Sequence, residues 1–365
     1  MCRCGGGRRH RGRRSRAVLT AGGHIQLERV YFVCSDCRQG GHPLDERLGV
    51  DGSTTVGAER LLCLAGASWS FDAASSNLKE FCGLSVSDNT VRKVCQQRAA
   101  TVERWQQNDP AAHRPFREAA GEVEFTTDGT CVNTTEGWKE MRVGVFAKRP
   151  AGDPATPAEW AERKLPPPTT RLAFAAIESA DKFASRWPVV ASRLGIGSRA
   201  AIDVTADGAR WIWDRVETYW PQACGTLDIY HALEHVSETA KSLYGEGTQP
   251  TRRWNDQARE SLLAEGYAGI ERVIRQARPT AVRAAQRQAL DSLSGYVEHQ
   301  RNHLNYAQRL AAGRPIGSGL VEGACKHLVG RRLKQTGARW LIPNANRMAT
   351  LTSLLYSQAW NNYWN

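Results

Sequence analysis

The chain has no run of about 18 apolar residues, which is the length that a membrane-spanning helix needs. Its arginine-rich start also lacks the apolar segment that follows the basic region of a secretory signal peptide. The sequence therefore argues against an integral membrane protein and against a secreted one. We expect a soluble cytoplasmic protein with no membrane partner.

Cysteine is sparse, because ten cysteines in 365 residues are too few for a disulfide scaffold. Six of them stand alone and are typical of reduced thiols: Cys63, Cys82, Cys95, Cys131, Cys224 and Cys325. The other four form two close pairs, Cys2 with Cys4 and Cys34 with Cys37.

The two cysteine pairs flank a predicted β-hairpin. Alternating apolar residues after the turn at Ala21 predict this hairpin over residues 18–33. Two pairs of thiols at the ends of a small β-unit can enclose a tetrahedral Zn²⁺. We therefore expect residues 1–57 to form a basic, zinc-ribbon-like module with Cys2, Cys4, Cys34 and Cys37 as ligands. The alternative is that the N-terminal thiols are free.

Acidic residues are missing from both ends of the chain. Residues 1–16 contain seven arginines and residues 323–365 contain six lysines or arginines, so nearly all of the net charge of +12 lies there. Two basic ends around a nearly neutral middle favour phosphate-bearing partners, because phosphates that are neutralised release their counterions. DNA is the partner that we expect.

Residues 58–115 show helical periodicity and predict a helix-turn-helix region. Gly83 interrupts the pattern, and Ser87 is a suitable N-cap for a third helix. The outward face of that helix would present Arg92, Lys93 and Gln96 to a DNA groove. Many such helices only pack, which is the alternative.

The remainder of the chain predicts a mixed α/β domain. Strand patterns at residues 122–127, 138–146, 171–177 and 200–205, and a short strand ending at Leu227, follow the element order of a ribonuclease-H-like fold. We expect this core to span residues 116–235 and 316–365. Between them, residues 236–315 predict an all-helical insertion.

Three carboxylates stand out in this core. Asp128 and Asp207 each follow a predicted strand and precede a glycine, and in this fold order the two strands are neighbours. Glu322 starts a predicted helix after the insertion. An Asp-Gly pair is more often a simple turn, but together the three carboxylates favour a site for Mg²⁺ or Mn²⁺.

The sequence resembles the ISKra-type transposases of bacterial insertion sequences over nearly its whole length. The strings that carry the resemblance are Thr127-Asp128-Gly129, Gly137-Trp138-Lys139-Glu140, Asp207-Gly208-Ala209-Arg210-Trp211-Ile212-Trp213, Leu227-Asp228-Ile229-Tyr230-His231-Ala232-Leu233-Glu234-His235 and Ile316-Gly317-Ser318-Gly319-Leu320-Val321-Glu322. The resemblance implies a DDE transposase whose triad is Asp128, Asp207 and Glu322. It also implies a bacterial, nucleoid-associated enzyme that acts on transposon ends and target DNA as a homo-oligomer.

Asp228 and His231 match an element seen after the second aspartate in several groups of DDE transposases. We expect both to approach the scissile phosphate, where an imidazolium could stabilise negative charge. The alternative is that His231 only caps or packs its helix.

A basic helix is predicted after Glu322. Its cations Lys326, Arg331, Arg332 and Lys334 would follow DNA phosphates beside the triad, although a charge run is usually only a solvated face. By contrast, we expect Trp138, Trp211 and Trp213 in the core. A catalytically silent DNA-binding regulator or domesticated transposase, or a nuclease that joins no strands, remains an alternative.

Overall fold

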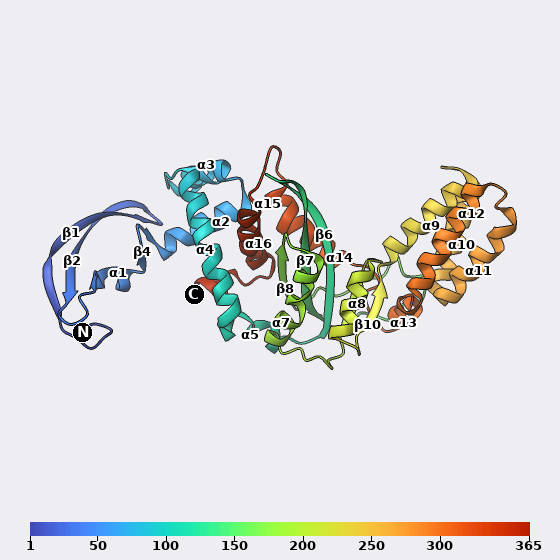
Figure 1. Cartoon of the computed structure of the whole chain (residues 1–365), viewed down its shortest axis with the longest axis horizontal. Coiled ribbons are helices and arrows are strands. Elements are labelled where there is room, and N and C mark those ends of the chain that lie inside the picture. The colour runs from blue at the N-terminus through green and yellow to red at the C-terminus, as the bar shows by residue number, and fades with distance from the viewer.

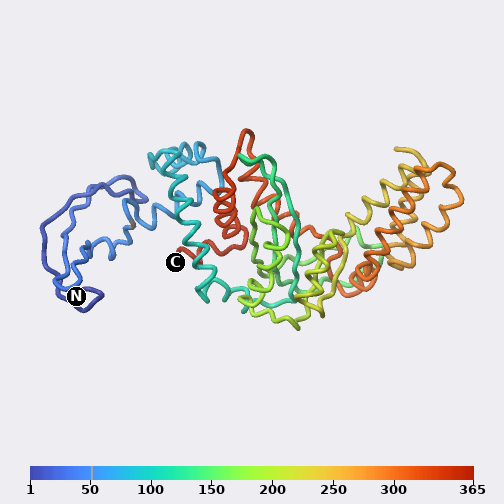
Figure 2. The backbone as a smooth tube through the Cα atoms, viewed as in Figure 1, coloured from blue at the N-terminus to red at the C-terminus, as the bar shows by residue number. Residues whose placement is uncertain are grey.

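The computed structural model describes residues 1–50 and 52–365. The chain is elongated, with the N-terminal module at one end, a five-stranded sheet in the middle and a helical bundle at the other end (Figure 1). The tube in Figure 2 shows that the C-terminus returns to the N-terminal side of the sheet, close to α4.

The N-terminal module contains one long hairpin. Its elements are β1 (Arg8–Thr20), β2 (Gly23–Cys34), β3 (Gly40–Gly41), α1 (Pro43–Leu48), β4 (Val50–Asp51) and β5 (Thr54–Thr55), with strand order β3-β2-β1-β5-β4. The predicted hairpin over 18–33 was too short, because β1 begins at Arg8, opposite Cys34. Most side chains of the arginine-rich half of β1 are exposed, so no apolar alternation marked it as a strand.

Three helices follow, as the periodicity predicts: α2 (Val56–Ser68), α3 (Phe71–Cys82) and α4 (Asp88–Asn108). Ser87 caps α4 by accepting a hydrogen bond from the Thr90 N–H at 3.1 Å. Gly66 lets α2 and α4 approach closely, since a Cβ there would lie 2.5 Å from the Cys95 sulfur. The short elements η1 (Pro110–Ala112) and α5 (Arg114–Glu118) lead into the central sheet.

The central sheet is mixed. Its strands are β6 (Glu122–Thr134), β7 (Gly137–Arg149), β8 (Thr170–Ala176), β9 (Asp203–Ala206) and β10 (Cys224–Leu227), in the order β10-β9-β6-β7-β8. β6 pairs antiparallel with β7 and parallel with β9, and β9 pairs parallel with β10. The predicted α/β class with a mixed sheet is therefore confirmed.

The two faces of the central sheet are covered differently. One face packs aromatic residues against α6 (Ala180–Ala184), α7 (Arg186–Arg193) and α8 (Arg210–Tyr219), with the rings of Phe125 and Phe146 4.6 Å apart. On the other face, Val143 and Val145 share one apolar core with α2, α4 and the C-terminal helices. The three N-terminal helices and the sheet are thus joined by a continuous core.

The insertion is a helical bundle that starts directly after β10. Its helices are α9 (Ile229–Tyr244), α10 (Gln249–Glu265), α11 (Tyr267–Ala277), α12 (Ala284–His299) and α13 (Tyr306–Ala311), with short 3₁₀ turns η2 (Arg278–Thr280) and η3 (Arg301–His303). Buried residues such as Ile270 and Leu290 give the bundle its own core.

The chain then returns to the sheet. It forms α14 (Gly319–Ala324), a π-helical stretch (Cys325–Gly330), α15 (Arg331–Leu333), α16 (Ile342–Tyr356) and α17 (Trp360–Trp364). Among the residues described, none of these helices or the others has the length and apolar character needed to cross a membrane.

Candidate functional site

Three aspartates line up across the parallel strands of the central sheet. Thr127 of β6 pairs with Ala206 of β9, which in turn pairs with Leu227 of β10. In each of the three strands the next residue along the sequence is an aspartate, so Asp128, Asp207 and Asp228 lie in one row. Parallel strands in register place such side chains on the same face, about 4.8 Å apart from strand to strand.

On the same face of the sheet, further rows of polar residues precede the aspartates along the three strands. Thr126, Thr205 and Thr226 form the next row, and all three are buried. Glu124 and Asp203 follow, and each pairs with an arginine: Arg149 lies 3.0 Å from Glu124, and Arg309 lies 2.5 Å from Asp203. A buried polar strip therefore leads up to the aspartates.

The sequence predicted that Asp128 follows the end of its strand, but in the structure it lies within β6. β6 continues to Thr134 because it keeps its antiparallel partner β7, whereas the parallel neighbour β9 stops at Ala206. Gly129 consequently makes no turn. It leaves room for the Glu140 side chain, whose carboxylate oxygen would lie 2.1 Å from a Cβ at this position.

Asp128 and Asp207 differ from Asp228 in their free acceptor capacity. Asp128 Oδ1 accepts the Gly129 N–H at 2.6 Å, and Asp207 Oδ1 accepts the Ala209 N–H at 2.9 Å. In each case the second oxygen has no partner among the described residues. Both carboxylates are only partly buried, so these oxygens are available to a ligand.

Asp228 is fully buried, and both of its oxygens are used. Oδ1 accepts the Tyr230 N–H at 2.7 Å and so caps α9, while Oδ2 accepts the Ser318 N–H at 2.7 Å and the Ser318 hydroxyl. The carboxylate thus connects the start of the insertion to the segment that returns from it.

Glu322 lies in the first turn of α14, four residues after Ser318. Its side chain is exposed and has no partner among the described residues. The helix is held on the sheet by packing against β6 and β7, and by a 3.0 Å hydrogen bond from the Tyr356 hydroxyl to the Leu320 carbonyl. A π-helical stretch follows directly, a conformation common at functional sites.

The electrostatics of Asp128 show which charges surround it. Burial raises the pKa of Asp128; the Gly129 N–H opposes this shift, and the negative charges of Asp207 and Glu322 add to it. The nearby His231 acts in the opposite direction. The structure therefore brings Asp128, Asp207, Glu322 and His231 into one neighbourhood.

His231 lies in the first turn of α9, and its Nδ1 is 3.5 Å from a Glu234 carboxylate oxygen. The insertion contributes a further residue that sequence reasoning missed, Tyr296 of α12. The Tyr296 ring packs on Gly208, where a Cβ would lie 2.7 Å from it, and lies over His235 with the ring centroids 3.9 Å apart. Only the folded bundle brings α12 to the Asp207 loop, so no local motif indicated it.

The predicted cations after Glu322 do not form one surface. Lys326, Arg331 and Lys334 are exposed, and Lys334 donates to the Thr130 hydroxyl, two residues beyond Asp128. Arg332 is buried, so its assignment to a DNA-facing surface is wrong. Its guanidinium lies over the rings of Phe71 and Trp340, and its Nε donates to the Gly66 carbonyl at 2.6 Å.

Helix α4 presents a basic face next to the N-terminal module. Arg92 and Lys93 are exposed and Gln96 is half-buried. A cavity of about 550 Å³ between β1 and α4 is lined by Lys93 and three arginines, Arg16, Arg98 and Arg104, with Glu59 as its one acid among the described residues. These groups form a positively charged recess.

The four N-terminal cysteines converge. Their sulfurs lie within 4.8 Å of one another, with Cys2 3.6 Å from Cys37 and Cys4 3.5 Å from Cys34. The Cys4 N–H lowers the pKa of Cys2 to about 6, and the N–H groups of Cys37 and Asp36 lower the pKa of Cys34. In the same cluster the neighbouring sulfurs raise the pKa of Cys37 to about 12. Four sulfurs gathered this closely can bind a metal such as zinc.

Within the described residues, the cysteines are the only group of metal-ligand side chains gathered this closely. The carboxylates of Asp128, Asp207 and Glu322 are not gathered this closely.

The burial of one tryptophan also differs from prediction. The Trp138 side chain is 69% exposed on β7, whereas Trp213 is buried and Trp211 is partly buried, as expected.

A comparison of the chain with models of known protein families finds no match. A comparison with curated proteins finds none either. The function must therefore be argued from the residues and their geometry.

Proposed function

We propose that the chain is a DDE transposase with a ribonuclease-H-like core. It binds the ends of a mobile DNA element and catalyses metal-dependent cleavage and strand transfer. The observation that carries the proposal is the position of Asp128 and Asp207 in one row on neighbouring parallel strands, with Glu322 close enough to raise the pKa of Asp128. The strand order β10-β9-β6-β7-β8 is the order expected for this fold.

The donor set fits a hard divalent cation. Asp128 and Asp207 each have a carboxylate oxygen without a partner, and Glu322 is exposed, so these three residues would hold Mg²⁺ or Mn²⁺. When bound, the ions stabilise the attacking and leaving oxygens of the phosphodiester. Burial is the main cause of the raised pKa of Asp128, and the nearby charges of Asp207 and Glu322 add to it, as expected for neighbouring carboxylates.

The neighbouring residues have distinct roles in this proposal. His231 is the group near Asp128 that can carry a proton and a positive charge, so it stabilises negative charge on the phosphate. Asp228 has no free oxygen and acts as a positioning residue, because it fixes Ser318 at the entrance to α14. Thus α14 is held where it can deliver Glu322.

DNA binding is proposed for two surfaces. The recess between β1 and α4, together with Arg92 and Lys93, would bind the element ends. Lys326, Arg331 and Lys334 would bind phosphates beside the carboxylates. A Zn²⁺ at Cys2, Cys4, Cys34 and Cys37 would hold the N-terminal hairpin in place.

A catalytically silent DNA-binding regulator is the second candidate. It is favoured by the looser arrangement of the three carboxylates compared with the cysteines, whose ligand atoms lie within 4.8 Å. The basic recess would serve this function equally well, so only catalysis separates the two candidates.

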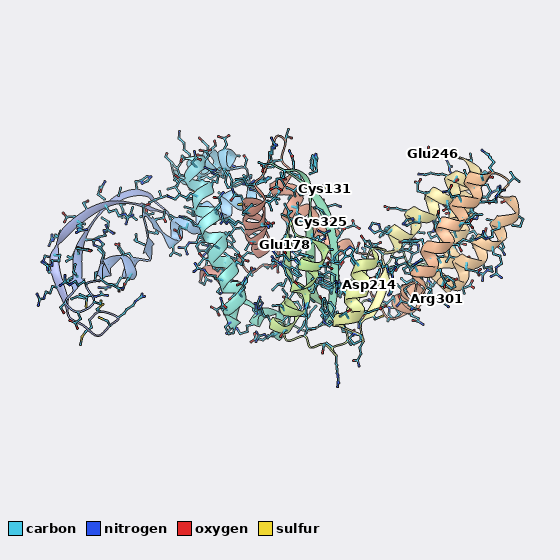
Figure 3. All side chains as sticks on the ribbon, viewed as in Figure 1. Cys131, Glu178, Asp214, Glu246, Arg301 and Cys325 are labelled. Carbon is cyan, nitrogen blue, oxygen red and sulfur yellow. The ribbon has the colours of Figure 1, made fainter. Side chains whose placement is uncertain are left out.

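The test uses the full-length chain, loaded with zinc, on linear DNA that carries its own gene and the flanking sequence. With Mg²⁺ or Mn²⁺ we expect nicks at defined positions and joined products. Asp128→Asn, Asp207→Asn and Glu322→Gln should each lower cleavage about a thousandfold, because several kcal/mol of transition-state stabilisation would be lost. Asp214→Asn, on the exposed side of α8, is the matched control (Figure 3).

The outcomes separate the candidates. Specific footprints without cleavage would favour the regulator, and nicks without joined products would favour a nuclease. Full activity of the three carboxylate variants would overturn the assignment of the triad.

A further inference from the structure

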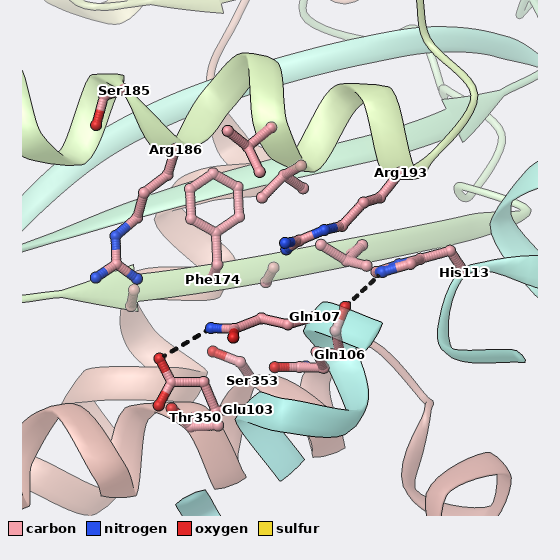
Figure 4. Close-up of a pocket in the computed structure, with 15 residues that line it drawn as sticks. Glu103, Gln106, Gln107, His113, Phe174, Ser185, Arg186, Arg193, Thr350 and Ser353 are labelled. Carbon is pink, nitrogen blue, oxygen red and sulfur yellow. Dashed lines mark hydrogen bonds between the residues drawn. The ribbon is translucent and has the colours of Figure 1, made fainter. Parts of the chain in front are cut away.

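A cavity of about 330 Å³ lies at the outer edge of the central sheet, away from the aspartate row. Strand β8 forms its floor, α7 lies on one side, and the end of α4 with α16 lies on the other (Figure 4). Its volume is within the range of pockets that hold small organic ligands. The cavity therefore lies between the helix-turn-helix region and the sheet.

Two buried polar atoms at this cavity have no hydrogen-bond partner. The Ser353 hydroxyl belongs to a residue that is 2% exposed, and the His113 Nδ1 to a residue that is 5% exposed. A buried polar group without a hydrogen-bond partner destabilises the folded chain. Such groups are expected to have a partner, and here both residues line the same empty space.

The protonation state of His113 determines whether its Nδ1 can accept a hydrogen bond. Its Nε2 lies 2.7 Å from the Gln106 carbonyl, which can only accept a hydrogen bond, so Nε2 carries the proton. Burial lowers the pKa of His113, against the effect of this hydrogen bond, and the charges of Arg193 and Arg117 lower it further, which favours the neutral ring. Nδ1 is consequently an acceptor that requires a donor from a ligand.

Two arginines reach the cavity from α7, as Figure 4 shows. Arg186 lies 2.6 Å from Glu178, a carboxylate that it shares with Lys182. The guanidinium of Arg193 has no carboxylate partner among the described residues, and Glu103 is the one acid in the lining. The floor and wall between the arginines are apolar, with Phe174, Val189 and Val190.

We propose that this cavity binds a small organic anion that has a flat or apolar body and at least one hydrogen-bond donor. The anionic group lies at Arg193 and Arg186, the body lies against Phe174 and Val190, and the donor reaches His113 Nδ1. Nucleotides and aromatic carboxylates share this chemistry. The site is separate from the proposed transposase centre and does not depend on it.

The test is calorimetric titration of the full-length chain with three kinds of probe. These are the nucleoside 5′-monophosphates, 4-aminobenzoate as an aromatic carboxylate with a donor, and inorganic phosphate. We expect one of the two organic anions to bind at least about tenfold more tightly than phosphate, and which of them binds identifies the source. Absence of binding by both, or equal binding of phosphate, would overturn the proposal.

Two variants locate the binding. Arg193→Gln should weaken the organic anion at least about tenfold, since it removes the charge-assisted hydrogen bonds. Ser353→Ala removes the unpaired hydroxyl that the ligand would pair with and keeps the volume of a small residue, so it should weaken binding without unfolding the chain. Arg259→Gln, on α10 of the distant bundle, is the matched control and should bind as the unmodified chain does. Unchanged affinity in both cavity variants would place the ligand elsewhere and overturn the assignment.

Discussion

Asp228 and Ser318 are 90 residues apart in the sequence, yet the Asp228 carboxylate accepts the backbone N–H of Ser318 at 2.7 Å and also its hydroxyl. The backbone closes the same gap, because the Ile229 N–H donates to the Ile316 carbonyl at 2.9 Å. The two ends of the insertion are therefore tied together at the sheet, and the start of α14 is fixed by the end of β10.

Removing this carboxylate should loosen the closure. Asp228→Ala leaves two donors of Ser318 unpaired and removes the cap of α9, so we expect a loss of about 2–4 kcal/mol in the free energy of unfolding. Urea unfolding measures this loss, and proteolysis between residues 305 and 318 should become faster. Asp214→Ala, whose side chain is 62% exposed, is the control, and an equal effect of the two variants would contradict the closure.

Asp128 should destabilise the metal-free protein at neutral pH. Burial and the charges of Asp207 and Glu322 raise its pKa, so the folded chain binds a proton there more readily than the unfolded chain. This contribution to stability is present below the ordinary carboxyl pKa and is lost as the pH rises through the raised value. Asp128→Asn should thus raise the melting temperature at pH 7, but not at about pH 4.

Divalent metal should reverse that difference. In thermal melts with Mg²⁺ or Mn²⁺, the unmodified chain should gain more stability than Asp128→Asn, because a cation that binds only the folded state stabilises it. Equal gains for both proteins would argue against Asp128 as a ligand.

Zinc removal should unfold the N-terminal module selectively. Few apolar side chains of the hairpin are buried, so a metal held by the four sulfurs would provide much of what stabilises it. We expect one zinc per chain, released by a chelator, and Cys4→Ser or Cys34→Ser should abolish stable binding. Cys131→Ser, an exposed cysteine on the central sheet, should leave the zinc content unchanged (Figure 3).

Arg332 and its neighbour Arg331 should respond differently to the same substitution. Arg332→Ala empties a stacked, hydrogen-bonded position between Phe71 and Trp340, and we expect a loss of about 2–4 kcal/mol in unfolding free energy. Arg331→Ala should change stability by less than about 0.5 kcal/mol. It should instead lower the salt dependence of DNA binding, by roughly one phosphate contact. A large stability loss in Arg331→Ala would contradict this division.

The periodic parts of the fold could be predicted from the sequence because their signals are local. The spacing of apolar residues predicted α2, α3 and α4, and Ser87 predicted the start of α4, which it caps. The mixed sheet followed from alternation, although β6 is longer than its pattern, since pairing with β7 continues beyond Asp128.

Burial of single side chains could not be predicted in the same way. Arg332 belongs to a run of basic residues, and the sequence of such a run does not indicate which member faces solvent and which is buried. Arg332 is buried only because α2 and α3 pack on the C-terminal helices. Trp138 was expected in the core but is exposed, because it lies near the tip of the β6–β7 hairpin, where no other element covers its ring.

The sequence by itself determined the candidate ligand chemistry: the paired cysteines, the aspartates Asp128 and Asp207, and the basic ends. It also determined the order of the elements, because hydrophobic periodicity and turn residues act over short distances. Only the tertiary structure decided that Asp128, Asp207 and Asp228 share one row, that Asp228 is occupied by Ser318, and that Tyr296 reaches Gly208. These relationships depend on strand register and on the closure of a long insertion, and both come from contacts between residues far apart in the chain.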